Sequence, residues 1–311
     1  MDSRALKILV IQTGGLGNWL MATGAFRDIR LHYPNARITH LTQPALSGLA
    51  RQEDFFDDLL LTKWDQPNDW DKFLESLFFN QLWKHKIKEL GFDIIFDFHC
   101  RKIEKTFYRD LSTKAFFLKK EYPHIFNVYQ DLLKEAGVLC QSEPRLHYFP
   151  VFNEKLGNSE DPISKPFVAL IARSKKEKSG KNWPVEKAQA LASLLQERGL
   201  TPVIIGRQQD LLPLKPLREM KGNIDLVNRA PLEMLSGLFA KAALAIGVDT
   251  GTTHLAAITG TPTVALYGPS PHEIWGIRGR QTSWVKKNGM NQISVNDVWK
   301  ACEAHLLTSL L

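Results

Sequence analysis

The sequence predicts an α/β protein made of two doubly wound domains, each with a mostly parallel sheet. The chain has 311 residues, and at about 100 to 200 residues per domain this length predicts two domains. Short apolar runs alternate with helical patterns along the chain, as in α/β proteins. A segment with four prolines and little periodicity, 141–166, interrupts the alternation and is typical of a linker. We therefore expect an N-terminal domain over residues 1–155 and a C-terminal domain over residues 156–311.

The N-terminal domain opens with the run KILVIQ at 7–12, which predicts a strand. The loop TGGLGN follows, and then a helical pattern over 19–32. Further strands are expected at 37–41 and at 92–98, where the run FDIIFDF is rich in Ile and Phe. Such continuous apolar runs are typical of the centre of a parallel sheet.

The C-terminal domain repeats this pattern, with strands predicted at 167–172, 202–206, 244–248 and 263–267. Pro184 occupies a favoured first helical position, and a helix over 188–198 is expected to end at Gly199. Ligands of doubly wound folds bind beyond the carboxyl ends of the strands. The loops expected to converge on one cleft are therefore 13–18, 173–181, 206–210 and 249–254.

The overall composition favours a folded protein with an anionic partner. Hydrophobic residues make up 44% of the chain and charged residues 23%, which excludes a disordered chain. Lys and Arg exceed Asp and Glu by 40 to 33, a net charge of +7. This excess suits nucleic acid, a membrane surface or a phosphorylated small molecule. No nucleic-acid-binding module is recognisable, so we expect no nucleic-acid partner.

The three cysteines, Cys100, Cys140 and Cys302, form no CxxC motif, which favours a reducing compartment and disfavours a zinc or redox site. The N-terminus has no leader pattern, and no run of about 18 apolar residues occurs. We therefore expect a cytoplasmic protein without a cofactor. Contact with the inner face of the cytoplasmic membrane stays compatible with this expectation.

The segment 248–271, VDTGTTHLAAITGTPTVALYGPSP, is the most informative part of the chain. A strand is expected to end at Asp249 and a helix to begin near Thr252. Unpaired amides, hydroxyls and the positive end of a helix dipole would make this point an anion site. The alternative is that Thr252 or Thr253 only caps the helix.

The sequence DTGTTHLAA followed by GTPTVALYGPSP resembles the signature of glycosyltransferase family nine, the ADP-heptose:lipopolysaccharide heptosyltransferases. The run KNWP at 181–184 and the loop at Gly206 resemble the family as well. The resemblance implies a GT-B fold, two Rossmann-like domains with the acceptor bound mainly by the first and the nucleotide sugar by the second. It also implies an inverting, metal-independent transferase that moves a heptose from ADP-heptose to an anionic lipopolysaccharide core acceptor.

The resemblance also assigns roles in the donor site. Lys181 matches the family lysine that contacts the donor pyrophosphate, where a cation would stabilise the leaving diphosphate. Asp210 matches an acid on the ribose, and Ala230 falls where the adenine lies. A solvated charge run is the preferred interpretation of the lysines at 175, 176 and 178. The donor-binding residues implied in this way are Ser174, Lys181, Asp210, Ala230, Asp249, Thr250, Gly251, Thr252, Thr253 and His254.

The first loop departs from the family pattern. The family has Gly-Asp here, with the Asp as general base, whereas Gly17 is followed by Asn18, and an amide cannot take up a proton. Three explanations stay open: another residue is the base, the chain is a weak or non-catalytic homologue, or Asn18 orients the acceptor while water or substrate takes the proton. Asp97 with His99 is the nearest other base, because alternation along a strand turns both the same way. A buried, satisfied pair is the alternative.

Acceptor binding is expected at the first loop and at a basic segment after the strand at 92–98. Arg101, Lys105 and Arg109 recur every four residues and would form one stripe on a helix, suited to the carboxylates and phosphates of a lipopolysaccharide core. An ordinary solvated face is the alternative. The predicted catalytic residues are Asn18, Asp97 and Lys181; the predicted acceptor-binding residues are Gly15, Gly17, Asn18, His99, Arg101, Lys105 and Arg109.

No metal site is expected. The run Asp69-Trp70-Asp71 resembles the DxD metal motif of other glycosyltransferases, but it lies in a polar, aromatic connection and not at a strand end. The loop at 13–18 also lacks the third Gly of GxGxxG, which disfavours a dinucleotide. Two alternatives to heptose transfer stay open: transfer of another sugar or to a protein acceptor, and a non-catalytic protein that binds a nucleotide sugar.

Overall fold

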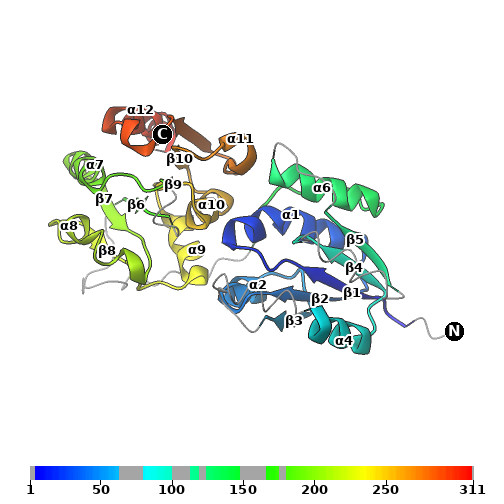
Figure 1. Ribbon diagram of the computed structural model, residues 1–311. Helices are drawn as coiled ribbons and strands as arrows, with labels where there is room; N and C mark the ends of the chain where they lie inside the picture. The colour runs from blue at the N-terminus through cyan, green and yellow to red at the C-terminus, as the bar shows by residue number, and fades with distance from the viewer. Residues whose placement is uncertain are drawn as a thin grey trace. The chain divides into compact units, whose positions relative to one another are not determined.

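The structure is a computed structural model and describes residues 4–62, 80–99, 113–118, 124–147, 166–174 and 180–309 (Figure 1). The chain divides into two compact units, Met1–Pro144 and Arg145–Leu311. Each unit contains one parallel sheet, of five and six strands, so the predicted fold class is confirmed. The predicted boundary at residue 155 lies in the segment 148–165, outside the described residues.

The sheet of the first unit has the strand order β3-β2-β1-β4-β5, and all its pairs are parallel. The order reverses beside β1, because the chain adds β2 and β3 on one side of it and β4 and β5 on the other. Such a reversal is the switch point at which doubly wound sheets bind ligands. The strands are β1 (Lys7–Ile11), β2 (Arg37–Thr42), β3 (Asp58–Leu61), β4 (Ile94–Asp97) and β5 (Lys114–Phe117).

Helices cover both faces of this sheet. On one face Trp83 and Ile87 of α4 (Asn80–Leu90) pack against Leu9, Leu41 and Ile95. On the opposite face α1 (Leu16–His32) and α6 (Ile125–Glu135) lie side by side (Figure 1). Burial on both faces explains why β1 and β4 are apolar throughout. The connection after β2 contains η1 (Pro44–Leu46) and α2 (Ser47–Gln52).

The sheet of the second unit has the order β11-β10-β9-β6-β7-β8, again all parallel. Here the order reverses between β6 and β9. The strands are β6 (Phe167–Ile171), β7 (Thr201–Ile204), β8 (Ile224–Asp225), β9 (Leu244–Val248), β10 (Thr263–Tyr267) and β11 (Thr282–Lys286). The helices are α7 (Val185–Glu197), η4 (Gln208–Asp210), α8 (Lys215–Arg218), α9 (Leu232–Lys241), α10 (Gly251–Ile258), α11 (His272–Trp275), η5 (Met290–Gln292) and α12 (Val295–Ser309).

Most predicted elements are present, with two shifted helix starts. α1 begins at Leu16 and not at residue 19, so Gly17 and Asn18 lie in its first turn and not in a loop. Gly15 has an extended backbone and serves as the N-cap, which lets the helix start immediately after it. Pro184 is the N-cap of α7 and not its first helical residue. Gly199 has a φ of +75° and ends this helix as predicted.

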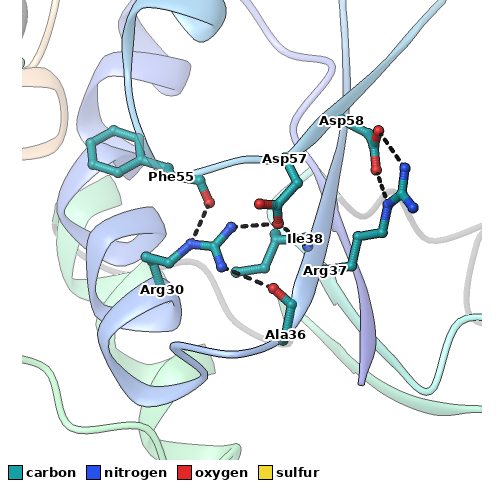
Figure 2. Close-up of polar contacts among 7 residues, drawn as sticks. All are labelled: Arg30, Ala36, Arg37, Ile38, Phe55, Asp57 and Asp58. Atoms are coloured by element: carbon teal, nitrogen blue, oxygen red, sulfur yellow. Dashed lines mark hydrogen bonds and ion pairs between the residues drawn. The ribbon is translucent and has the colours of Figure 1, made fainter. Parts of the chain in front are cut away.

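Figure 2 shows how polar contacts fasten the end of α1 to the sheet. Arg30 donates to Asp57 (2.6 Å) and to the carbonyls of Ala36 (2.9 Å) and Phe55 (3.3 Å). Asp57 also accepts from the amide of Ile38 in β2 (2.7 Å). One guanidinium therefore holds the helix, the turn before β2 and the turn before β3 in place.

Exposed charges join β2 to β3 directly. The guanidinium of Arg37 binds both oxygens of Asp58, at 2.6 and 3.1 Å. These hydrogen bonds hold the pKa of the Asp58 carboxyl below its usual range. Because both side chains are exposed, the pair contributes little to stability.

The other end of α1 is fixed through a buried histidine. The Nδ1 of His40 lies 2.9 Å from the Val10 carbonyl, and its Nε2 lies 2.9 Å from the indole nitrogen of Trp19. A carbonyl accepts and an indole donates, so Nδ1 carries the proton and the ring is neutral. The ring also stacks on Phe56, with centroids 4.2 Å apart. Burial lowers the pKa of His40 to about 3.

This buried ring predicts a loss of stability in mild acid. The unfolded chain binds a proton at His40 near pH 6.5, whereas the folded chain excludes it, so the free energy of unfolding falls as pH drops below 6.5. Between pH 7 and pH 5 we expect the wild-type protein to lose about 2 kcal/mol more than His40→Gln, whose amide does not titrate. Urea denaturation at both pH values measures the difference.

The exposed His32 at the end of α1 provides the matched control. His32→Gln should keep the pH dependence of the wild-type protein. If the wild-type protein and His40→Gln lost equal free energy of unfolding between pH 7 and pH 5, the conclusion that His40 is buried and neutral would be contradicted.

Candidate functional site

The predicted donor residues of the second unit follow neighbouring strands at one edge of its sheet. Ser174 comes shortly after β6, Asp210 after β7, Ala230 after β8 and Asp249 directly after β9. In a parallel sheet these carboxyl ends share an edge, and the switch point between β6 and β9 is the place where ligands bind. The structure therefore assembles these loops within one unit.

Asp249 lies at the centre of this edge. Its side chain is 8% exposed, with Oδ2 2.7 Å from the Lys181 ammonium and Oδ1 4.0 Å from Nε2 of His254. Burial and the nearby Asp249 charge both raise the pKa of the Tyr267 phenol. Three predicted donor residues are thus brought together, with a partly exposed ammonium held by a buried carboxylate.

The segment that carries Lys181 is fixed by hydrogen bonds of the two residues that follow the lysine. The amide of Ser174, itself buried, donates to Oδ1 of Asn182 (2.8 Å). The buried indole of Trp183 donates to the carbonyl of Ile293 (3.2 Å). Because the two residues after Lys181 are fixed in this way, the position of its ammonium is set by the fold. The lysines at 175, 176 and 178 lie outside the described residues.

Helix α10 presents its N-terminus at the same edge. Thr250 is its N-cap and makes no side-chain capping bond, so the alternative that Thr252 or Thr253 caps the helix is wrong. Thr253 is fully buried, and its hydroxyl donates to the Val248 carbonyl (2.7 Å). A side chain at Gly247 would collide with this hydroxyl. The amide of Thr253 donates to the Thr250 carbonyl (3.0 Å). The amides of Gly251 and Thr252 have no acceptor within the helix, so this end is suited to an anion.

Asp210 holds two arginines at the ends of β6 and β7. It is buried, with Oδ1 3.3 Å from Nε of Arg173 and Oδ2 2.9 Å from the amide of Arg207. The Arg207 guanidinium also lies 3.7 Å from Oδ2. A Cβ on Gly206 would lie 3.1 Å from Cβ of Asp210, so glycine lets the carboxylate fold back over the loop. Burial lowers the pKa of Arg207, and the neighbouring Arg173 lowers it further.

Sequence reasoning did not identify Arg173 and Arg207 as members of this site. The signal was available, since each directly follows a predicted strand end. The loop after β8 contacts the loop after β7. Asn228, which has a left-handed backbone with a φ of +59°, donates its backbone N–H to the Gly206 carbonyl (2.9 Å). This contact fixes the backbone that leads to Ala230, whose adenine contact stays a prediction.

In the first unit, Gln12 directly follows β1, at the corresponding edge of the sheet. Its buried amide donates to the Phe98 carbonyl (3.0 Å) and to the Tyr129 hydroxyl (3.1 Å). Its Oε1 accepts from the amide of Gly14 (2.8 Å). One side chain thus joins β1, the end of β4 and α6. Sequence reasoning treated Gln12 only as the end of a strand.

The side chains of Asn18 and His99 both lie close to Gly14. A Cβ built on Gly14 would lie 2.7 Å from Oε1 of Gln12, 3.1 Å from Nδ1 of His99 and 3.2 Å from Nδ2 of Asn18. A side chain at this position would have to displace the Gln12 amide oxygen, and the Asn18 and His99 side chains border the same small space. Asn18 reaches it from the first turn of α1, which contains no acidic residue.

Asp97 is placed differently from His99. β4 ends at Asp97, so the alternation expected to align the two side chains does not continue to His99. Asp97 is 1% exposed, and its Oδ1 accepts from the amide of His99 (2.8 Å). His99 is half-buried. The predicted pair therefore consists of a buried carboxylate and a more accessible imidazole.

Several predicted features lie outside the described residues, and their roles stay predictions. They are the basic stripe of Arg101, Lys105 and Arg109 and the run Asp69-Trp70-Asp71. Within the described part of the chain, no group of three or more His, Cys, Asp or Glu side chains is placed to hold a metal ion. Among the helices described, none is long and apolar enough to cross a membrane.

Comparisons with curated proteins find partial similarity. Lipopolysaccharide heptosyltransferase 1 of Salmonella typhimurium is 27% identical over 122 residues, 39% of this chain and 38% of that protein. The Escherichia coli K12 protein of the same name is 27% identical over 117 residues, 37% of each chain. The matched segment thus spans less than two-fifths of the length of these relatives.

Solved structures match over nearly the whole chain. A family 9 glycosyl transferase from Veillonella parvula is 20% identical, with a TM-score of 0.80 over 99% of both chains. The E. coli heptosyltransferase WaaC with ADP is 16% identical, with a TM-score of 0.75 over 96% of this chain and 100% of that one. These similarities support the GT-B fold. The model of the family described as glycosyltransferase family 9 (heptosyltransferase) matches residues 97–302, more than half of the chain, and the chain therefore belongs to glycosyltransferase family 9.

Proposed function

We propose that the protein is an inverting glycosyltransferase that moves a heptose from ADP-heptose to a hydroxyl of a lipopolysaccharide core acceptor. The observation that carries the proposal is the arrangement of Lys181, Asp249 and the N-terminus of α10 at the switch point of the second sheet. Family membership supports transfer of a sugar. Solved relatives are described with ADP and with ADP-2-deoxy-2-fluoro heptose, which supports the choice of donor.

The donor side of the reaction follows from the charges at this edge. When the bond between sugar and diphosphate breaks, negative charge grows on the leaving ADP. The Lys181 ammonium and the first amides of α10 would stabilise that charge, and they are held in place before the reaction begins. Asp249 keeps the ammonium at a fixed point. The proposed reaction is metal-independent because these groups supply the positive charge.

The acceptor side is assigned to the edge of the first sheet, around Gly15, Asn18 and His99. The net charge of +7 suits an anionic acceptor at a membrane surface. The protein would then act in the cytoplasm, in peripheral contact with the inner face of the cytoplasmic membrane. A second candidate, a non-catalytic protein that binds a nucleotide sugar, is favoured by one observation only, Asn18 in the place of the family Asp.

Nucleotide binding tests the donor. We expect ADP to raise the melting temperature by a few degrees, since a ligand at 100 times its Kd stabilises the folded state by about 2.7 kcal/mol. UDP and GDP at the same concentration should have little effect. Thermal unfolding followed by tryptophan fluorescence measures all three. Stabilisation by UDP or GDP in place of ADP would point to another donor, and no stabilisation by any of them would contradict a nucleotide site at this edge.

Replacing the site lysine tests its role in the leaving step. Lys181→Met should lower kcat about 100-fold or more, the usual cost of removing one group that stabilises transition-state charge. Release of ADP from ADP-heptose in the presence of a lipopolysaccharide core acceptor measures the rate. The exposed Lys215 of α8, paired with the exposed Glu219, offers the control Lys215→Met, which should keep the wild-type rate.

A double variant distinguishes the effect of losing the Lys181 ammonium from the effect of the Asp249 carboxylate that remains. Lys181→Met alone leaves the Asp249 carboxylate uncompensated beside the diphosphate. Lys181→Met with Asp249→Asn removes that carboxylate and should stay far below the wild-type kcat. Wild-type turnover in either variant would exclude Lys181 from the leaving step.

A further inference from the structure

A proton acceptor is needed for the transfer described above, and Asn18 cannot serve as one. We propose that His99 is the general base and that Asn18 orients the acceptor hydroxyl toward it. Asp97 is then a positioning residue. This inference rests on the proposed function, because it names the base of the same reaction.

The first argument is the shared position of the two side chains. Nδ1 of His99 and Nδ2 of Asn18 both lie within 3.2 Å of the point where a Cβ on Gly14 would be. Gly14 is itself held by Oε1 of Gln12 (2.8 Å). A hydroxyl that accepts a hydrogen bond from the Asn18 amide is thereby brought within reach of the imidazole.

The second argument is accessibility. Asp97 is 1% exposed, so its carboxylate is shielded from an acceptor that arrives from solvent. Its Oδ1 accepts from the His99 amide (2.8 Å), which fixes the backbone that carries the imidazole. His99 is half-buried and keeps access to solvent. Burial thus distinguishes Asp97 from His99, which the sequence alone had left together as the alternative base.

The third argument is the chemistry of the described side chains near the imidazole. Gln12, Gly14 and Asn18 bring no charge to the imidazole. Two of the described hydrogen bonds bring titratable groups to this place. The Asp97 carboxyl accepts from the His99 amide, and the Tyr129 phenol accepts from the Gln12 side chain. Burial raises the pKa of Tyr129, so the phenol stays neutral. An imidazole, with an ordinary pKa near 6.5, is suited to general base catalysis near pH 7.

The proposed step balances as follows. The acceptor hydroxyl oxygen forms a bond to the anomeric carbon of the heptose, and its proton moves to the unprotonated Nδ1 of His99. The bond between the anomeric carbon and the diphosphate oxygen breaks, and its electron pair leaves with ADP. His99 becomes an imidazolium ion and afterwards releases the proton to water.

The test is the pH dependence of kcat/KM for ADP release, measured from pH 4.5 to 9. We expect the wild-type rate to fall in acid, because a protonated base cannot take the proton of the acceptor hydroxyl. His99→Gln should lower kcat at least 100-fold, the usual contribution of a general base, with ADP still stabilising the protein as before. The exposed His85 of α4 gives the control His85→Gln, which should keep both rate and profile.

A second variant supplies a base at the neighbouring position. His99→Gln combined with Asn18→Asp should recover much of the lost rate, and its acid limb should move toward the range of a carboxylate, so that the rate stays level down to about pH 5. Asp97→Asn should retain the acid limb of the wild-type protein, because the His99 imidazole is still present.

The possible results separate this inference from the proposed function. Wild-type kcat and an unchanged acid limb in His99→Gln would overturn the assignment of His99. Loss of the acid limb in Asp97→Asn, with His99 intact, would overturn it in favour of Asp97. Turnover by Asn18→Asp but not by the wild-type chain would show that His99 does not act as the base. No transfer by any of these proteins, despite binding of ADP, would overturn the proposed function itself.

Discussion

Both halves of this protein depend on one constraint, the reversal of strand order in a parallel sheet. In each unit the chain builds strands to one side of the first strand and then to the other, so the connections leave the sheet in opposite directions beside β1 and beside β6. The carboxyl ends on either side of the reversal are neighbours, although they are distant in sequence. Gln12 and Phe98 meet in this way in the first unit, as do Lys181, after β6, and Asp249, after β9, in the second. The chemistry proposed for the protein is located at these edges.

The two edges differ in charge, and the difference matches the two parts of a glycosyl transfer. At the second sheet, buried carboxylates hold cations in fixed positions: Asp249 holds Lys181, and Asp210 holds Arg173 and Arg207. Such an arrangement favours a leaving diphosphate, because its charge meets groups that are already oriented. At the first sheet the described side chains around Gly14 are amides and an imidazole. Among these side chains, the imidazole can accept a proton and then release it.

Much of the fold was predictable from local pattern. The strands β9 and β10 have their predicted bounds because continuous apolar runs between turn residues mark buried parallel strands. The short β3 and β5 were not predicted: each has four residues and lies at an edge of the sheet, with mostly half-buried side chains, so the apolar run in each is short. The helix α1 starts at Leu16, earlier than the predicted residue 19, because the extended backbone of Gly15 determines where it begins. The residues of the donor edge were named from family resemblance. Arg173 and Arg207 could have been inferred from their positions directly after predicted strands, whereas the role of Gln12 becomes evident only from long-range contacts, such as that with Tyr129, 117 residues away.

The most direct test of this account is a crystal structure of the protein with ADP. The account predicts that the diphosphate lies at the edge of the second sheet, within hydrogen-bond distance of the Lys181 ammonium and of the first amides of α10. A diphosphate bound instead at the loop after β1, beside Gly14 and Gly15, would contradict the assignment of donor and acceptor to the two sheets.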